Sequence, residues 1–96
     1  MYGVFITMEN IDLSDEEVAI SFNEAKERII HVAKKHEAIM FENFYILKYS
    51  ENKLVYLLKF LRDLKSIENF NQYVELLHIM RISEVESIPA KQLEKM

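Results

Sequence analysis

The sequence Tyr-Gly-Val-Phe-Ile-Thr-Met at positions 2–8 is the stretch that decides the fold. Its β-branched and aromatic residues predict a buried strand, which the polar residues 9–10 close into a loop. Apolar side chains fall on both alternations of this strand, with Val4 and Ile6 on one face and Phe5 on the other. We therefore expect both faces of the sheet to need a cover.

A long amphipathic helix is predicted next. Ser14 is a candidate N-cap, and Glu17 three residues later completes a capping box. Apolar residues then recur at spacings of three and four, as on one face of a helix: Val18, Phe22, Ala25, Ile29 and Val32. The helix is expected to end near Lys35, because basic residues in the last turn complement the helix dipole.

A hairpin and a second helix follow. Residues 38–50 are apolar on both alternations but are interrupted at 42–43, where an asparagine tolerates the left-handed backbone of a tight turn. We therefore expect antiparallel strands at about 38–41 and 44–49. Leucines at helical spacing then predict a helix of about fourteen residues that starts near residue 50 or 51: Leu54, Leu57, Leu58, Leu61 and Leu64.

The remaining segments complete the pattern. Residues 66–72 are interpreted as a connector, and residues 73–83 return to extended character. The order β-α-β-β-α-β is typical of an α+β, ferredoxin-like domain, which has a four-stranded antiparallel sheet with two helices on one face. One such domain is expected over residues 1–86. A tail or a short helix that Pro89 would open follows at 87–96.

The second face of the sheet predicts self-association. The last predicted strand places Leu77 and Ile79 on one side and a further apolar set on the other: Val74, Leu76, Met80 and Ile82. Two helices can cover only one face. The other face either keeps scattered exposed apolar side chains under a short tail, or belongs to a homodimer that packs on it or joins sheets edge to edge. A contiguous apolar patch favours the homodimer.

Composition excludes several kinds of site. The chain has no cysteine, which rules out disulfides and thiolate metal sites, and its three histidines lack ligand-like spacing: His31, His36 and His78. His31 and His36 are expected at the surface of the first helix. The net charge of −4 provides no global positive field for nucleic acid. No apolar run approaches the roughly 18 residues of a membrane span and no basic leader is present, so we expect a cytoplasmic protein without membrane contact.

Four segments share order and near-gapless spacing with a known family. They are Met-Tyr-Gly-Val-Phe-Ile at 1–6, Phe-Asn-Glu-Ala at 22–25, Asn-Phe-Tyr-Ile at 43–46, and Asp-Leu-Lys-Ser-Ile at 63–67 ahead of Phe70 and Val74. Over residues 1 to about 86 the chain resembles the virulence-associated protein D family, itself similar to the small CRISPR-associated adaptation subunit that forms ferredoxin-like dimers. The resemblance implies a cytoplasmic homodimer with endoribonuclease activity in a toxin–antitoxin or stress system.

Several residues depart from this family's pattern. Thr7 stands where the family's first strand ends in an aspartate, and a threonine hydroxyl neither holds a metal nor acts as a base unaided. Residues 42–43 replace a Gly-Ser pair. Residues 73–78 lack the family's two arginines and its aspartate, with His78 in place of the second arginine. The resemblance therefore implies an altered site, which either uses other groups or is inactive.

The candidate catalytic residues are Glu9, Asn43 and His78. His78 could act as a general acid or base, with Asn43 orienting a phosphate. Glu9 lies two residues beyond Thr7 on the same strand face and could join Glu42 as a relocated carboxylate pair. The alternatives are solvated acids and a histidine half-covered at a sheet or dimer surface. No cofactor is expected, apart from a divalent metal if the site is active.

Candidate RNA contacts lie at the ends of the two helices. Basic residues there could form a local patch: Lys34, Lys35, Lys59, Arg62 and Lys65. Tyr45 or Tyr49 could stack on bases beside that patch. The alternative is an ordinary solvated face, which the acidic balance of the chain favours.

Two functions remain open at this point. In the first, the chain is an endoribonuclease of the virulence-associated protein D type, with an altered site at a dimer cleft. In the second, it is a non-catalytic homodimer that binds a partner protein, as an antitoxin-like or phage-encoded regulator would. The family resemblance favours the first function, and the residues themselves favour the second.

Overall fold

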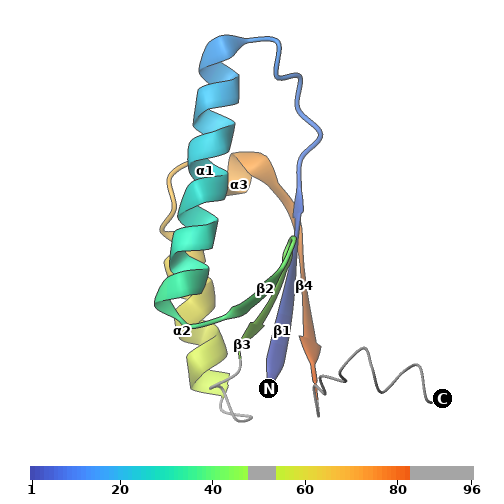
Figure 1. The fold of residues 1–96 in the computed structure, drawn as a ribbon, viewed down its shortest axis with the longest axis vertical. Helices are drawn as coiled ribbons and strands as arrows, with labels where there is room; N and C mark the ends of the chain where they lie inside the picture. The colour runs from blue at the N-terminus through green and yellow to red at the C-terminus, as the bar shows by residue number, and fades with distance from the viewer. Residues whose placement is uncertain (48–53, 83–96) are drawn as a thin grey trace, which may run out of the picture.

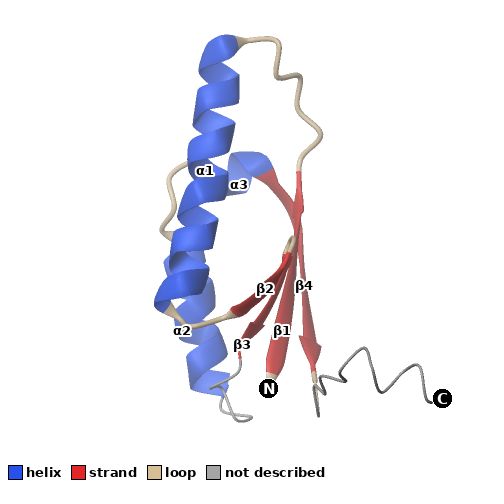
Figure 2. Cartoon of the chain, in the orientation of Figure 1, coloured by secondary structure: helices blue, strands red, loops and turns tan. Residues whose placement is uncertain are grey.

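The computed structural model describes residues 1–47 and 54–82. They form one sheet of order β2-β3-β1-β4, in which every neighbouring pair is antiparallel. The elements in chain order are β1 (Tyr2–Met8), α1 (Glu16–Lys35), β2 (Ile39–Phe41), β3 (Phe44–Leu47), α2 (Leu54–Lys65), α3 (Phe70–Tyr73) and β4 (Val74–Arg81). Figures 1 and 2 show the helices on one side of the sheet. The predicted α+β, ferredoxin-like arrangement is confirmed.

Helix α1 is capped by a different residue from the predicted one. The carboxylate of Asp15 accepts hydrogen bonds from the backbone N–H groups of Glu17 at 2.9 Å and Val18 at 3.4 Å. Ser14 instead donates its own backbone N–H to the carboxylate of Asp12 at 3.0 Å. Aspartate is the better cap here because its negative charge also interacts favourably with the helix dipole.

The hairpin between β2 and β3 has the predicted position but a different turn residue. Glu42, and not Asn43, has the left-handed backbone, with a φ of 52°. Asn43 continues the sheet, since its carbonyl oxygen accepts a hydrogen bond from the Ile6 N–H at 2.9 Å. The predicted end of this strand at residue 49, the predicted helix start near residue 50 and the predicted tail at 87–96 lie outside the described residues.

The predicted connector at 66–72 contains the start of a short helix. Asn69 takes a left-handed φ of 64°, and α3 begins at the next residue. Tyr73 of α3 is buried, and Phe22 of α1 packs edge-on against it with ring centroids 5.5 Å apart. A helix of four residues is too short to produce a hydrophobic period, and α3 is held by burial of Tyr73 against Phe22 and of Phe70 in the main core.

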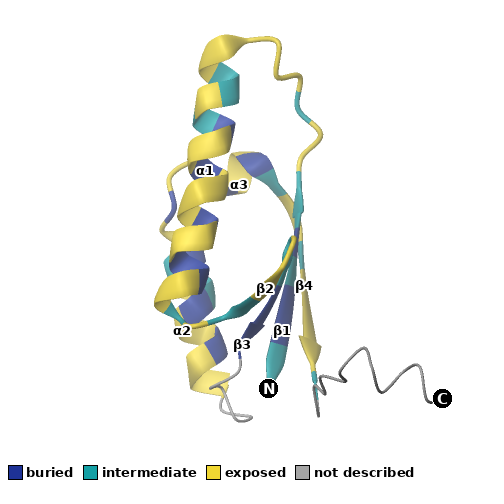
Figure 3. Cartoon of the chain, in the orientation of Figure 1, coloured by how far each residue is buried: buried dark blue, intermediate teal, exposed yellow. Residues whose placement is uncertain are grey.

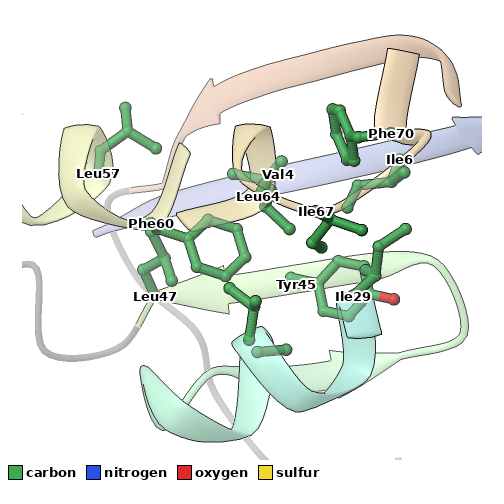
Figure 4. Packing of buried hydrophobic residues seen from close by; sticks show 12 residues of the cluster. Val4, Ile6, Ile29, Tyr45, Leu47, Leu57, Phe60, Leu64, Ile67 and Phe70 are labelled. Atoms are coloured by element: carbon green, nitrogen blue, oxygen red, sulfur yellow. The ribbon is translucent and has the colours of Figure 1, made fainter. Parts of the chain in front are cut away.

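The core lies between the helices and one face of the sheet, as Figure 3 shows. Val4 and Ile6 of β1 are almost completely buried there. Phe60 and Leu64 of α2 and Ile29 of α1 belong to the same cluster, which Figure 4 shows from close by. The even-numbered side of β1 is therefore the side that the helices cover.

A register shift moves side chains of β4 from one face to the other. Thr7 pairs with Leu76 but Met8 pairs with Val74, which leaves Glu75 as an extra residue in β4. Directly opposed residues share a face, so Val74 lies on the helix side and Leu76 on the other side. The prediction that these two residues share a face is wrong, because one extra residue inverts the alternation.

Replacement of Phe60 by alanine should lower the free energy of unfolding by about 3–5 kcal/mol, because the ring is completely buried and its loss leaves a cavity. Val55→Ala, on the exposed side of the same helix, is the matched control and should change stability by less than about 0.5 kcal/mol. Urea denaturation followed by circular dichroism measures both. Equal losses in the two variants would contradict this position of the core.

Candidate functional site

The sheet face opposite the helices is mainly apolar, and we call it the open face; its side chains range from Ile46, which is 3% exposed, to Phe41, which is 58% exposed. Its residues are placed by strand register, because side chains of directly opposed residues point to the same side. They are Gly3, Phe5, Thr7, Ile39, Phe41, Phe44, Ile46, Leu76, His78 and Met80. No helix within residues 1–47 and 54–82 covers this face, as Figure 2 shows.

One row of the open face crosses all four strands. Phe41 of β2 lies opposite Phe44 of β3, which lies opposite Phe5 of β1. On its other side, Phe5 lies opposite His78 of β4. The ring of Phe5 is tilted against both neighbours, with centroids 6.4 Å from Phe44 and 6.4 Å from His78. We call these four residues the aromatic row.

Gly3 allows the aromatic row to lie close to the sheet. A Cβ atom at this position would come within 2.7 Å of Phe44 Cζ and 2.8 Å of Ile82 Cδ1. Both side chains therefore occupy the space that a side chain at position 3 would fill. The single glycine of the chain is explained by this close approach, since its φ is not in the left-handed region.

Charge is sparse on the open face. Of the ten residues that define it, His78 alone has an ionisable side chain. In the part of the chain that the structure describes, no three His, Asp or Glu side chains are grouped so that they could hold a metal ion. The open face thus provides apolar contact area rather than a polar site.

The predicted catalytic residues are not brought together within one chain. His78 is at one end of the aromatic row. Asn43 comes directly before Phe44 and lines a pocket on the helix side of the sheet. Glu9 is exposed beyond the end of β1, and its backbone N–H donates to the carbonyl oxygen of Tyr73 at 2.7 Å. The catalytic roles of Glu9, Asn43 and His78 stay predictions.

The predicted RNA contacts have different environments. Lys34, Lys59 and Arg62 are exposed, and the ammonium group of Lys59 lies over a tyrosine ring of its own helix. Tyr45 is only 5% exposed and packs in the core, so its ring presents no free face to a base. Tyr49 lies outside the described residues. Lys35 is also exposed, and RNA binding by Lys34, Lys35, Lys59 and Arg62 stays a prediction.

A cluster of polar side chains joins α1 to α2. His36 Nε2 lies 2.6 Å and Lys35 Nζ lies 3.3 Å from the same carboxylate oxygen of Asp63. These hydrogen bonds, that of His36 above all, hold the pKa of Asp63 below its ordinary value of 3.8. The ring of His36 also packs edge-on against Phe60, with centroids 5.4 Å apart. His36 is therefore half-buried, and the prediction of a plain surface position for it is wrong.

Comparisons with known proteins assign no family. No protein-family model matches the chain, and no curated protein matches it. Among the described residues, no helix has both the length and the apolar character that crossing a membrane requires. The open face and the pocket beside α1 are therefore the two candidate functional surfaces.

The cluster around Asp63 should contribute stability that depends on pH. The folded-state pKa of Asp63 is lower than its ordinary value of 3.8, so the contribution is present above about pH 4 and is lost as the pH falls through the folded pKa. We expect Asp63→Asn to lower the free energy of unfolding at neutral pH and to have a shrinking effect below about pH 4. Urea unfolding at several pH values measures this difference.

Glu68→Gln is the control for that experiment. It removes an exposed ion pair with Arg28, 3.6 Å long, and should change stability by less than about 0.5 kcal/mol. If the effect of Asp63→Asn remains constant as the pH falls, the hydrogen bonds to Asp63 do not act as described.

Proposed function

We propose that this protein is a non-catalytic homodimeric interaction protein, whose two copies pack together through their open faces. The aromatic row carries the proposal, because it crosses all four strands on the sheet face that no described helix covers. Phe41, Leu76 and Met80 of this face are 58%, 50% and 42% exposed. A contiguous exposed apolar patch on a protein of this size typically marks an interface.

The distribution of charge favours a second copy as the partner. The chain has a net charge of −4, but the open face contains no acidic side chain, so two such faces meet without bringing like charges together. Aromatic residues with few charges are typical of the centre of homodimer interfaces. Nucleic acid is a poorer partner, because its phosphates require basic side chains and the face has none apart from His78.

The outer edge of β4 supports self-association in a second way. β4 spans eight residues and, within the described parts of the chain, pairs only with β1. A long apolar edge strand is a template for pairing with another strand. Pairing of two β4 edges would extend the sheet and continue the open face from one copy to the next.

The dimer is tested by placing a charge on the open face. Phe41→Glu should give a monomer, because it would bury an unpaired carboxylate in the interface. Leu58→Glu on α2 is the matched control. The exposed fraction of Leu58, 54%, is similar to the 58% of Phe41, but Leu58 lies on a helix away from the open face. In light scattering at tens of micromolar, the parent protein and Leu58→Glu should be dimers, and Phe41→Glu should be a monomer.

A monomeric parent protein would refute the proposed dimer. A dimer that survives Phe41→Glu would exclude the open face as the contact and leave the β4 edge. Circular dichroism of each variant establishes that the fold is kept, which is expected because both replaced side chains are mainly in solvent.

Endoribonuclease activity is the second candidate function. The segment resemblance supports it, and so does His78, which is exposed beside Phe5. Because Asn43 and His78 lie on different sides of the sheet, we expect no cleavage of mixed RNA, with or without Mg²⁺ or Mn²⁺. Cleavage that is lost in both His78→Ala and Glu9→Ala would overturn the non-catalytic proposal and restore the predicted site.

A further inference from the structure

A pocket lies between α1 and the hairpin that joins β2 and β3. Its volume is about 400 Å³, within the range of sites for small molecules. Apolar side chains form most of its wall: Ile6, Met8, Ile29 and Ile30. The polar lining residues are Lys26 of α1, Glu42 and Asn43 of the hairpin, and Tyr45 of β3. The pocket is on the helix side of the sheet and is separate from the open face.

The hydroxyl group of Tyr45 has no hydrogen-bond partner among residues 1–47 and 54–82. Tyr45 is only 5% exposed, yet its hydroxyl forms no hydrogen bond with any described residue. The hydroxyl is not sealed from solvent either, so it opens on the pocket that Tyr45 lines. In Figure 4 this oxygen lies beside Ile29 and points away from Phe60. Because the hydroxyl opens on the pocket, it can bond to water in the free protein, and a polar atom of a ligand could take the place of that water.

Opposite charges flank the same pocket. Neither Lys26 nor Glu42 forms an ion pair with a described residue, although the ammonium of Lys26 lies 5.6 Å from the ring centroid of Phe22. Glu42 also occupies a left-handed backbone position, with a φ of 52°, where glycine would fit without strain. The pocket therefore combines one cation, one anion, apolar walls and a hydroxyl that opens on it.

We propose that this pocket binds a free α-amino acid with an aromatic side chain. The ligand carboxylate would contact Lys26, and its ammonium group would contact Glu42. The aromatic ring would lie against the apolar wall of the pocket, with a polar ring atom at the hydroxyl of Tyr45. A simple anion would be repelled by Glu42, and a simple cation would be repelled by Lys26. A zwitterion, which carries both charges, fits the pocket best. This inference does not depend on the dimer.

L-Tryptophan is the probe, because it has both charged groups and an indole N–H that can donate to the Tyr45 hydroxyl. Titration of the ¹⁵N-labelled protein should shift the backbone amides of the pocket residues, with a dissociation constant on the order of 1 mM. Tryptamine, which lacks the carboxylate, and indole-3-propionate, which lacks the ammonium group, should each bind about tenfold more weakly. L-Phenylalanine should bind about threefold more weakly, because it cannot bond to the hydroxyl.

Two variants assign the contacts. Tyr45→Phe should remove the preference for tryptophan over phenylalanine and should leave the melting temperature unchanged or higher, because the hydroxyl bonds to none of the described residues. Glu42→Gln, at an exposed turn, should weaken the binding of L-tryptophan but not the binding of indole-3-propionate. Lys59→Met on α2 is the control and should change the affinity neither for L-tryptophan nor for indole-3-propionate.

The proposal is overturned if L-tryptophan causes no saturable shift at the pocket amides. It is also overturned if tryptophan, tryptamine and indole-3-propionate bind with equal affinity, since the two charges would then have no role. These outcomes leave the dimer unaffected, because light scattering tests it through different residues.

Discussion

The central strand β1 carries apolar side chains on both faces, and the rest of the structure depends on how each face is covered. Hydrogen bonds to β3 and β4 occupy both of its edges, so a cover can come only from above or below the sheet. Helices α1 and α2 cover the side of Val4 and Ile6 and form the core there. Gly3 and Phe5 point to the other side, which no described helix reaches. The open face thus exists because the sheet has two apolar faces and the two long helices cover only one of them.

Strand alternation also separates the molecule into two surfaces with different chemistry. Asn43 and Phe44 are neighbours in the chain, but the first lines the pocket beside α1 and the second belongs to the aromatic row. The aromatic row is apolar and almost free of charge, as suits a macromolecular partner. The pocket is concave and has Lys26 and Glu42 in its lining, as suits a small molecule. One hairpin therefore contributes to both surfaces.

Polar and aromatic contacts join α1 to α2 at the end of α1. The carboxylate of Asp63 on α2 holds His36 and Lys35 at the end of α1, and Phe60 packs against the His36 ring. These contacts set the position of α1 over the sheet. Every pocket residue on α1 is carried by the same rigid helix.

The sequence by itself determined the four strands, the two long helices and their order, though not α3, because alternation at 2–8, the helical spacing at 18–32 and the leucines of α2 are signals between chain neighbours. Only the tertiary structure decided which residues meet. The bulge at Glu75 changed the faces of β4, and the contact of His36 with Asp63 joins residues 27 apart in the chain. Likewise, the separation of Asn43 from His78 depends on strand register. The physical reason is that pairing between distant strands sets the register, and a slip of one residue inverts every face.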